Sequence, residues 1–107
     1  MTRRIHLGAF AFHPGGAHVT GWRHETARPD RHLTIGHYKH FAETAERGVF
    51  DTIFLADGLY FWDRHPSGVD HYGQLRLEPL TLLSALAVHT AHIGLAATIS
   101  TTYNEPY

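Results

Sequence analysis

Cysteine is missing from this sequence of 107 residues. Its absence excludes disulfides, thiolate nucleophiles and cysteine-ligated zinc or iron–sulfur sites. An excess of charge of one sign is missing too, because nine Lys and Arg stand against ten Asp and Glu, and no basic stripe suggests nucleic-acid binding. The totals fit a single soluble domain over residues 1–107, which we expect to lie in the cytoplasm.

Long hydrophobic runs and metal-binding motifs are also lacking. The longest apolar stretch, 82–88, is interrupted by Ser84 and is far too short to cross a membrane. The eleven histidines are scattered along the chain. His37 and His40 share a helical face but have no third ligand near them in the sequence. We therefore expect neither a membrane segment nor a metal site.

What the sequence does contain is a regular alternation of two patterns. Apolar, β-favouring runs at 5–12, 52–56 and 92–99 predict three short buried strands. Between them, helical spacing of apolar residues predicts one helix that begins at Gly36 and stops at Gly48, and a second from Glu78 to Ala87. Their order, without any hairpin signal, predicts two consecutive right-handed βαβ units.

The two predicted helices carry more detailed expectations. In the first, the core face should comprise Tyr38, Phe41, Ala42, Ala45 and Val49. Gly48 should end this helix in the left-handed conformation, which glycine adopts without strain. The second helix is apolar nearly all round, so we expect it to be well buried.

The placement of the loops points to an α/β fold. Two long segments without periodicity, 13–35 and 57–76, each follow a predicted strand, as on the active-site edge of parallel-sheet enzymes. No G-x-G-x-x-G follows the first strand, which disfavours a dinucleotide-binding doubly wound sheet. We therefore predict the N-terminal β-α-β-α-β portion of a (β/α)8 TIM barrel with parallel strands.

A closed barrel needs eight strands and about 250 residues. The predicted barrel is therefore incomplete, and 1–107 is expected to be a single, truncated domain. Its sheet would have open edges, so we expect the isolated chain to be marginally stable or to associate.

Candidate functional residues lie where the predicted strands end. Asp57 follows the second strand at the barrel rim; alternatively, it caps N–H groups at the start of a loop. Thr98 and Ser100 share a face at the end of the third strand, where hydroxyls could bond a polar ring edge, although Thr also simply favours strands. Phe10 and Phe54 point either into the barrel mouth or into the core.

The first long loop contributes further candidates. His18, Trp22 and Arg23 would suit a planar or anionic ligand, or would pack the loop against the domain.

Several segments in series resemble one protein family. The runs 45–57 (AERGVFDTIFLAD), 77–87 (LEPLTLLSALA) and 93–107 (IGLAATISTTYNEPY), with the loop 18–24 (HVTGWRH), are similar to the nitrilotriacetate monooxygenase and dibenzothiophene-sulfone monooxygenase group. This group is part of the bacterial-luciferase-like superfamily of flavin monooxygenases. The segment 61–72 carries no such signature, and we expect it to vary with substrate.

The resemblance implies a two-component monooxygenase. A separate NAD(P)H:flavin reductase would supply reduced FMN, and one oxygen atom from O2 would enter a small organic substrate. Asp57 and Thr98 would contact FMN, while Phe10, His18 and Phe54 would lie towards the substrate pocket. The full-length form would be a homo-oligomer.

The same resemblance places the catalytic residues and the phosphate cradle of the flavin beyond residue 107. We therefore expect the chain alone to be inactive. The alternatives are a non-catalytic flavin- or ligand-binding module and a structural remnant of such an enzyme.

Overall fold

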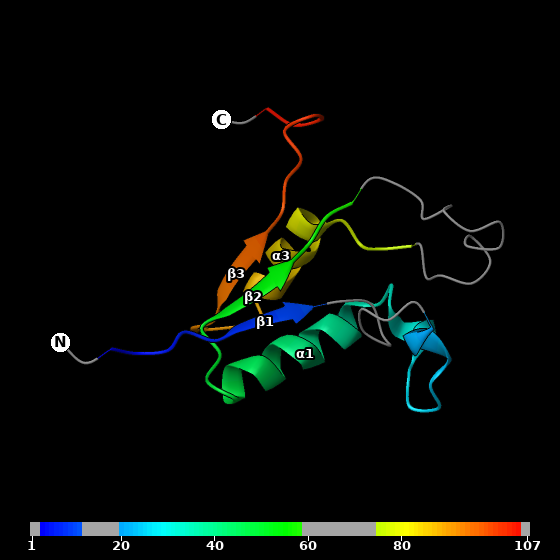
Figure 1. The fold of residues 1–107 in the computed structure, drawn as a ribbon, viewed down its shortest axis with the longest axis horizontal. Helices are drawn as coiled ribbons and strands as arrows, with labels where there is room; N and C mark the ends of the chain where they lie inside the picture. Colours follow the sequence, from blue (N-terminus) through cyan, green and yellow to red (C-terminus); the bar gives the residue numbers. More distant parts are fainter. Residues whose placement is uncertain (1–2, 12–19, 59–74, 106–107) are drawn as a thin grey trace.

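Three short parallel strands form the centre of the structure (Figure 1). The computed structural model describes residues 3–11, 20–58 and 75–105. The strands are β1 (Gly8–Ala11), β2 (Thr52–Leu55) and β3 (Gly94–Ala97), and they lie in the order β1-β2-β3. Each strand pairs in parallel with the next, so the predicted β-α-β-α-β order and parallel sheet are confirmed.

The strands are shorter than the apolar runs that predicted them. Ile5 lies ahead of the first paired residue and is 87% exposed, so the apolar run at 5–12 begins before the sheet does. At the other end of the sheet, the Thr98 N–H still donates to the Leu55 carbonyl at 2.9 Å, one residue beyond β3. Hydrogen bonding thus continues to the point where the outgoing segment of β3 begins.

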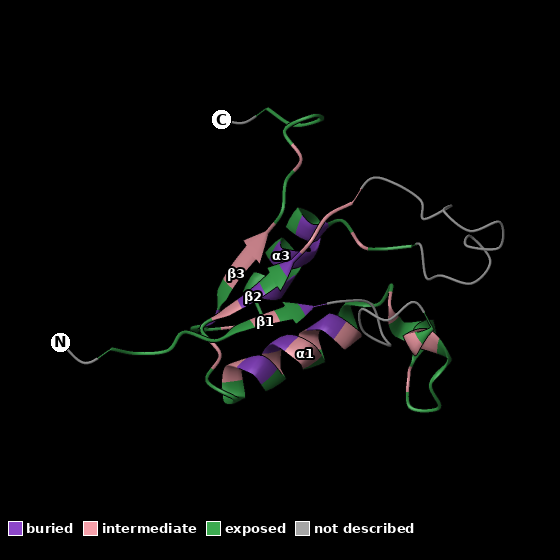
Figure 2. Ribbon diagram, in the orientation of Figure 1, coloured by how far each residue is buried: buried purple, intermediate pink, exposed green. Residues whose placement is uncertain are grey.

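Two helices pack together on one face of the sheet, α1 (Ile35–Arg47) and α3 (Pro79–Ala87). Figure 2 shows the buried residues gathered where these helices meet the strands. The core comprises Ala11, Tyr38, Ala42, Ala45, Ile53, Leu55, Leu82, Leu83, Leu86 and Ile93. Two short 3-10 turns, η1 (Gly21–Arg23) and η2 (Pro29–Arg31), lie in the long segment 13–35 that shows no periodicity in the sequence.

The helix α3 begins as predicted but is not buried all round. Pro79 occupies its first turn, and the Glu78 carboxylate caps it by accepting from the Leu80 and Thr81 N–H groups at 2.9 and 2.7 Å. Leu82, Leu83 and Leu86 face the core, whereas Leu80 is 44% exposed. The expectation that this helix is well buried holds only for the side that faces the core, because the helix packs along one side.

The end of α1 also differs from expectation. Gly48 has an ordinary φ of −76°, and Val49 is the residue with a positive φ, 57°. The Val49 N–H donates to the Glu46 carbonyl and the Phe50 N–H to the Ala45 carbonyl, both at 3.0 Å, which is the Schellman pattern of a helix C-terminus. The left-handed position therefore falls on a β-branched residue, which is strained there.

Val49 is also absent from the core, since it is 81% exposed. Its predicted place on the apolar face was wrong because the helix ends at Arg47, before the helical spacing reaches it.

Replacing Val49 with Gly should stabilise the fold. The left-handed conformation costs an L-residue about 1–2 kcal/mol, and glycine removes this cost. Glycine also loses more backbone entropy on folding, which destabilises the variant by about 0.5–1 kcal/mol. We expect a net gain of roughly 0.5–1 kcal/mol in the free energy of unfolding, measured by urea denaturation. Little packing is lost, because the Val49 side chain is exposed.

Val88 provides a matched control. It follows α3 directly, is 80% exposed, and has an ordinary φ of −81°. Val88→Gly removes no strain and adds only entropy to the unfolded chain, so it should destabilise. Equal effects of the two substitutions would show that Val49 is not strained.

Candidate functional site

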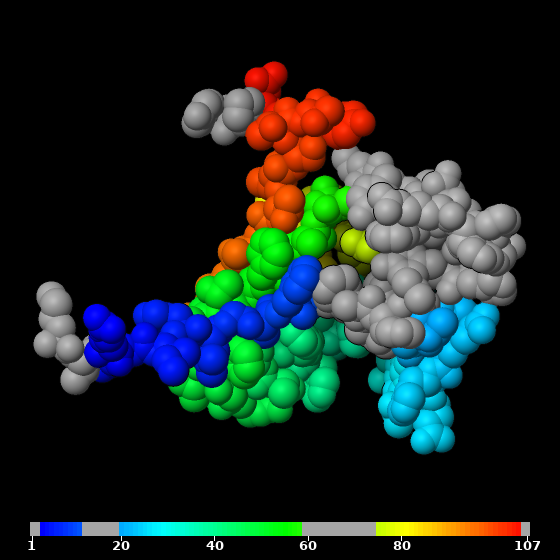
Figure 3. Space-filling view, in the orientation of Figure 1, coloured from blue at the N-terminus to red at the C-terminus, as the bar shows by residue number. Residues whose placement is uncertain are grey.

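The face of the sheet opposite the helices carries exposed aromatic side chains. Strand alternation places Gly8, Phe10, Thr52, Phe54, Gly94 and Ala96 on this face, because their neighbours Ala11, Ile53 and Leu55 are buried against the helices. In the space-filling view the three strands lie side by side at the surface (Figure 3). In a closed barrel this face would be the interior.

Phe10 and Phe54 lie opposite each other in the register of β1 and β2. Their ring centroids are 5.2 Å apart at an interplanar angle of 41°, within the range of favourable aromatic pairs. Phe10 is 48% and Phe54 36% exposed, so neither ring is part of the helix-packed core. The sequence left two alternatives for these rings, the barrel mouth and the core. The structure places both rings on the open face and not in the core.

Thr98 and Asp57 both follow strands at the carboxyl edge of the sheet. Thr98 is exposed, and alternation after Ala97 puts it on the same face as Phe54. Asp57 is half-buried, two residues beyond β2, and its Oδ1 accepts from the Gly58 N–H at 2.8 Å. This hydrogen bond is the local capping role that we gave as the alternative for Asp57. It engages Oδ1, one of the two carboxylate oxygens.

The remaining candidates have local roles or lie outside the described residues. Ser100 belongs to a turn, where its carbonyl accepts from the Tyr103 and Asn104 N–H groups at 3.3 and 3.2 Å. The Arg23 guanidinium lies 5.0 Å from the Trp22 ring centroid, so these two loop side chains contact each other. His18 and the segment 61–72 are not among the described residues.

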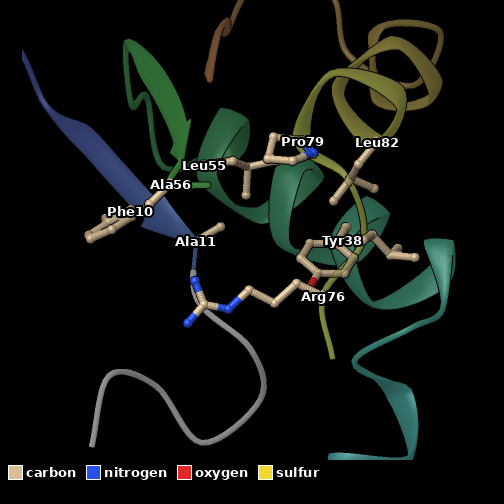
Figure 4. A pocket seen from close by; sticks show the side chains of 9 residues that line it. Phe10, Ala11, Tyr38, Leu55, Ala56, Arg76, Pro79 and Leu82 are labelled. Atoms are coloured by element: carbon tan, nitrogen blue, oxygen red, sulfur yellow. The ribbon is translucent and has the colours of Figure 1, made fainter. Parts of the chain in front are cut away.

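A small hollow lies at the same edge, behind the sheet (Figure 4). The Arg76 side chain runs from beside the Tyr38 hydroxyl towards Ala11 at the end of β1. Burial raises the pKa of the buried Tyr38 hydroxyl, while the Arg76 charge opposes that rise. The hollow has a volume of about 30 Å³, room for a few waters and too little for a flavin ring.

At the opposite, amino edge of the sheet, two carboxylates bind backbone N–H groups from distant segments. Glu46 Oε1 accepts from Ala91, His92 and Ile93, at 2.9, 2.6 and 3.0 Å. Asp51 Oδ2 accepts from the Leu7 N–H at 2.7 Å, and its Oδ1 lies 3.2 Å from His6 Nδ1. These hydrogen bonds hold the pKa of each carboxyl group below its usual value.

These two structural roles were not predicted from the sequence. The sequence did contain one signal for the role of Glu46. An acidic residue in the last turn of a helix is disfavoured by the helix dipole, so its presence there indicates a specific partner.

The described residues contain no helix long and apolar enough to cross a membrane. Nor does this part of the chain bring together three or more His, Asp or Glu side chains that could hold a metal ion.

The fold first defines a class. Three parallel strands with two helices in β-α-β-α-β order match the N-terminal part of a luciferase-like TIM barrel. A solved structure of riboflavin lyase, with modified FMN and riboflavin bound, superimposes with a TM-score of 0.84 at 28% identity. The match covers 98% of this chain and 25% of that one.

Sequence comparison then gives the family. The chain is 46% identical over 106 residues to N-acetyl-S-(2-succino)cysteine monooxygenase of Bacillus subtilis, covering 98% of this chain and 23% of the relative. It is 42% identical over 113 residues to nitrilotriacetate monooxygenase component A of Aminobacter aminovorans, covering 98% of this chain and 25% of the relative. The chain is a homologue of the bacterial-luciferase-like monooxygenases, and the predicted resemblance is confirmed.

The chain spans about a quarter of the length of these curated relatives. No protein-family model matches the sequence.

Glu46 should matter for stability in a pH-dependent way. Its carboxyl pKa is lowered on folding, so its contribution is fully present above the unfolded pKa, near 4.5, and is lost as the pH falls through the folded value. Glu46→Gln should therefore lower the urea midpoint at neutral pH. The difference from the wild-type chain should shrink in acid.

Glu43→Gln is the matched control for this test. Glu43 lies on the same helix and forms an ion pair with Lys39 at 3.8 Å, four residues away, on the helix surface. Such exposed pairs contribute little, so this variant should change the midpoint only slightly. A Glu46→Gln variant no less stable than Glu43→Gln at neutral pH would contradict the role of Glu46.

Proposed function

We propose that the chain forms the first three strands of an FMN-dependent, two-component monooxygenase that inserts one oxygen atom from O2 into a small organic substrate. The observation that supports this most is the 46% and 42% identity to two monooxygenases across 98% of the chain. A separate NAD(P)H:flavin reductase would be the functional partner, and we place the homo-oligomeric enzyme in the cytoplasm.

The open face of the sheet fits a flavin. Gly8, Gly94 and Ala96 leave it free of large side chains beside the Phe10–Phe54 pair, so a planar ring has room above it. Thr98, exposed at the carboxyl edge, offers a hydroxyl to the polar edge of such a ring. Reduced FMN, when bound, supplies the oxidising chemistry together with O2.

In this proposal the residues of the chain bind and orient the flavin and the substrate, and they exclude water. Thr98 would hydrogen-bond the ring edge, and the second carboxylate oxygen of Asp57 would accept from the ring or from a neighbouring group. Phe10 and Phe54, joined by His18 from the first loop, would form the apolar wall on which the substrate lies. These five assignments are hypotheses that rest on the family and on the open face.

The cofactor requirement is directly testable in the complete barrel protein that contains this sequence. With photoreduced FMN and O2, product should form from a carboxylated probe such as nitrilotriacetate or N-acetyl-S-(2-succino)cysteine, the compounds named for the relatives. No nicotinamide cofactor should be needed. Product that appears only when NADH is also added would refute the two-component assignment, and flavin binding without any oxygenated product would favour a non-catalytic module.

Flavin contacts can be tested by anaerobic titration of reduced FMN. Losing a neutral hydrogen bond costs about 0.5–1.5 kcal/mol, so Thr98→Val should weaken affinity by up to about tenfold. Asp57→Ala should weaken it more, because hydrogen bonds to charged groups are stronger.

Thermal melts and a control variant make the titration decisive. Thr44→Val, on the outer surface of α1, should leave affinity unchanged. If Asp57 only caps its turn through the Gly58 N–H, Asp57→Ala will lower the melting temperature without changing affinity. Unchanged affinity in both Thr98→Val and Asp57→Ala would remove the flavin assignment.

A further inference from the structure

The hollow at the carboxyl edge of the sheet contains a buried hydroxyl group that makes no hydrogen bond within the fold. Tyr38 lies on α1 and is only 6% exposed. In the part of the chain that the structure describes, its hydroxyl has no hydrogen-bond partner. Figure 4 shows this hydroxyl beside the Arg76 side chain in the lining of the hollow. Leaving a buried hydroxyl unpaired costs stability, so its presence here indicates a partner from outside the fold.

Arg76 brings a positive charge to the same hollow. It lies just before α3, and its side chain runs from the Tyr38 hydroxyl to the end of β1 (Figure 4). Among the described residues Arg76 forms no ion pair with a carboxylate. Its charge acts on the Tyr38 hydroxyl, where it opposes the rise in pKa that burial causes. A phenol and a guanidinium group therefore face one small space, and neither is paired with an acceptor from the described chain.

The chemistry of these two groups defines the ligand that suits them. Both donate hydrogen bonds, and the guanidinium group matches the two oxygens of a carboxylate in a planar, bidentate arrangement. The volume of about 30 Å³ has room for a few waters, which a carboxylate group would replace, and is small for a phosphate group. The rest of the lining is mainly apolar and includes Leu55, Pro79 and Leu82. Apolar surroundings strengthen a hydrogen bond to a charged acceptor.

We infer that Tyr38 and Arg76 bind a carboxylate group of the substrate at the end of β1. The inference rests on the proposed function, and it gives that function a substrate class, namely molecules that join a carboxylate to an apolar part. Phe10 connects the two regions, because its ring pairs with Phe54 on the open face and the residue also lines the hollow. A substrate whose apolar part lies on the two rings would extend its carboxylate around the end of β1 to Arg76.

The test compares two matched probes by calorimetry. Phenylacetate joins a carboxylate to an apolar ring, and phenylacetamide is its neutral counterpart. Both are titrated into the complete barrel protein without flavin, at constant ionic strength set with chloride. Phenylacetate should bind about tenfold or more tightly than phenylacetamide, because hydrogen bonds to a charged acceptor are stronger than those to a neutral one.

Two substitutions should remove the preference for the carboxylate. Arg76→Gln removes the positive charge, and Tyr38→Phe removes the hydroxyl while keeping the ring in the core. Each should weaken phenylacetate binding by about tenfold and bring its affinity close to that of phenylacetamide. Tyr38→Phe should not lower the melting temperature, because the hydroxyl makes no hydrogen bond within the described fold.

Arg47→Gln and Tyr103→Phe are the matched controls. Arg47 lies at the end of α1, and Tyr103 is 72% exposed in the segment after β3. Neither substitution should change the affinity for phenylacetate. Equal weakening by Arg47→Gln and Arg76→Gln would show a diffuse effect of net charge and would overturn the proposal.

Turnover then connects the site to the substrate. With photoreduced FMN and O2, phenylacetate should raise the KM of the oxygenated substrate and leave kcat unchanged. An unchanged KM would overturn the proposal, and so would equal binding of the acid and the amide, which is expected if the hollow binds only water. Failure of the proposed function would give a different result, namely no turnover. Binding of phenylacetate to the flavin-free protein, and its loss in Arg76→Gln, would in that case still support the carboxylate site.

Discussion

The carboxylate of Glu46 holds together parts of the chain that no local interaction could join. A single oxygen accepts from three successive N–H groups, those of residues 91–93, which lead directly into β3. These residues are 45 to 47 positions away in sequence. The end of α1 thereby fixes where β3 begins, and with it the register in which Ile53 lies opposite Leu95.

Asp51 performs the corresponding task for β1. Its carboxylate binds the Leu7 N–H, its own N–H donates to the Leu7 carbonyl at 2.8 Å, and its carbonyl accepts from the Gly94 N–H at 2.8 Å. One residue thus touches the start of all three strands. Gly94 is required there, because a Cβ would come within 2.7 Å of Thr52 Oγ1 and 3.1 Å of the Asp51 carbonyl oxygen. The amino edge of the sheet is therefore rigidly defined by hydrogen bonds and close packing.

The sequence predicted the order and type of the elements because local patterns encode them: three apolar runs, helical spacing in α1, and Pro79 at the start of α3. It did not predict contacts between distant residues, such as Glu46 with Ala91, because no local pattern records a partner 45 residues away. Its placement of Val49 on the apolar face failed because the helix ends at Arg47, two residues before Val49.

The candidate site was predictable to a similar degree. The positions of Asp57 and Thr98 follow from strand ends alone, and the structure puts both at the carboxyl edge. Whether Phe10 and Phe54 face the core could not be decided from short runs with apolar residues on both faces. Only the pairing of β1 with β2, together with the burial of Ala11 and Leu55, assigns the rings to the open face.

The two edges of the sheet have different roles: the amino edge is structural, and the carboxyl edge carries the candidate site beside the open face. Parallel sheets are normally covered on both faces, and here the helices cover one, while Phe10 and Phe54 remain exposed on the other. At the amino edge, the carboxylates of Glu46 and Asp51 accept from backbone N–H groups and thereby have a structural role. The exposed Thr98 and the half-buried Asp57 lie at the carboxyl edge instead, beside the uncovered rings. A planar, partly apolar ring with a polar rim would satisfy both the apolar face and these edge groups, which is the physical basis for placing the flavin there.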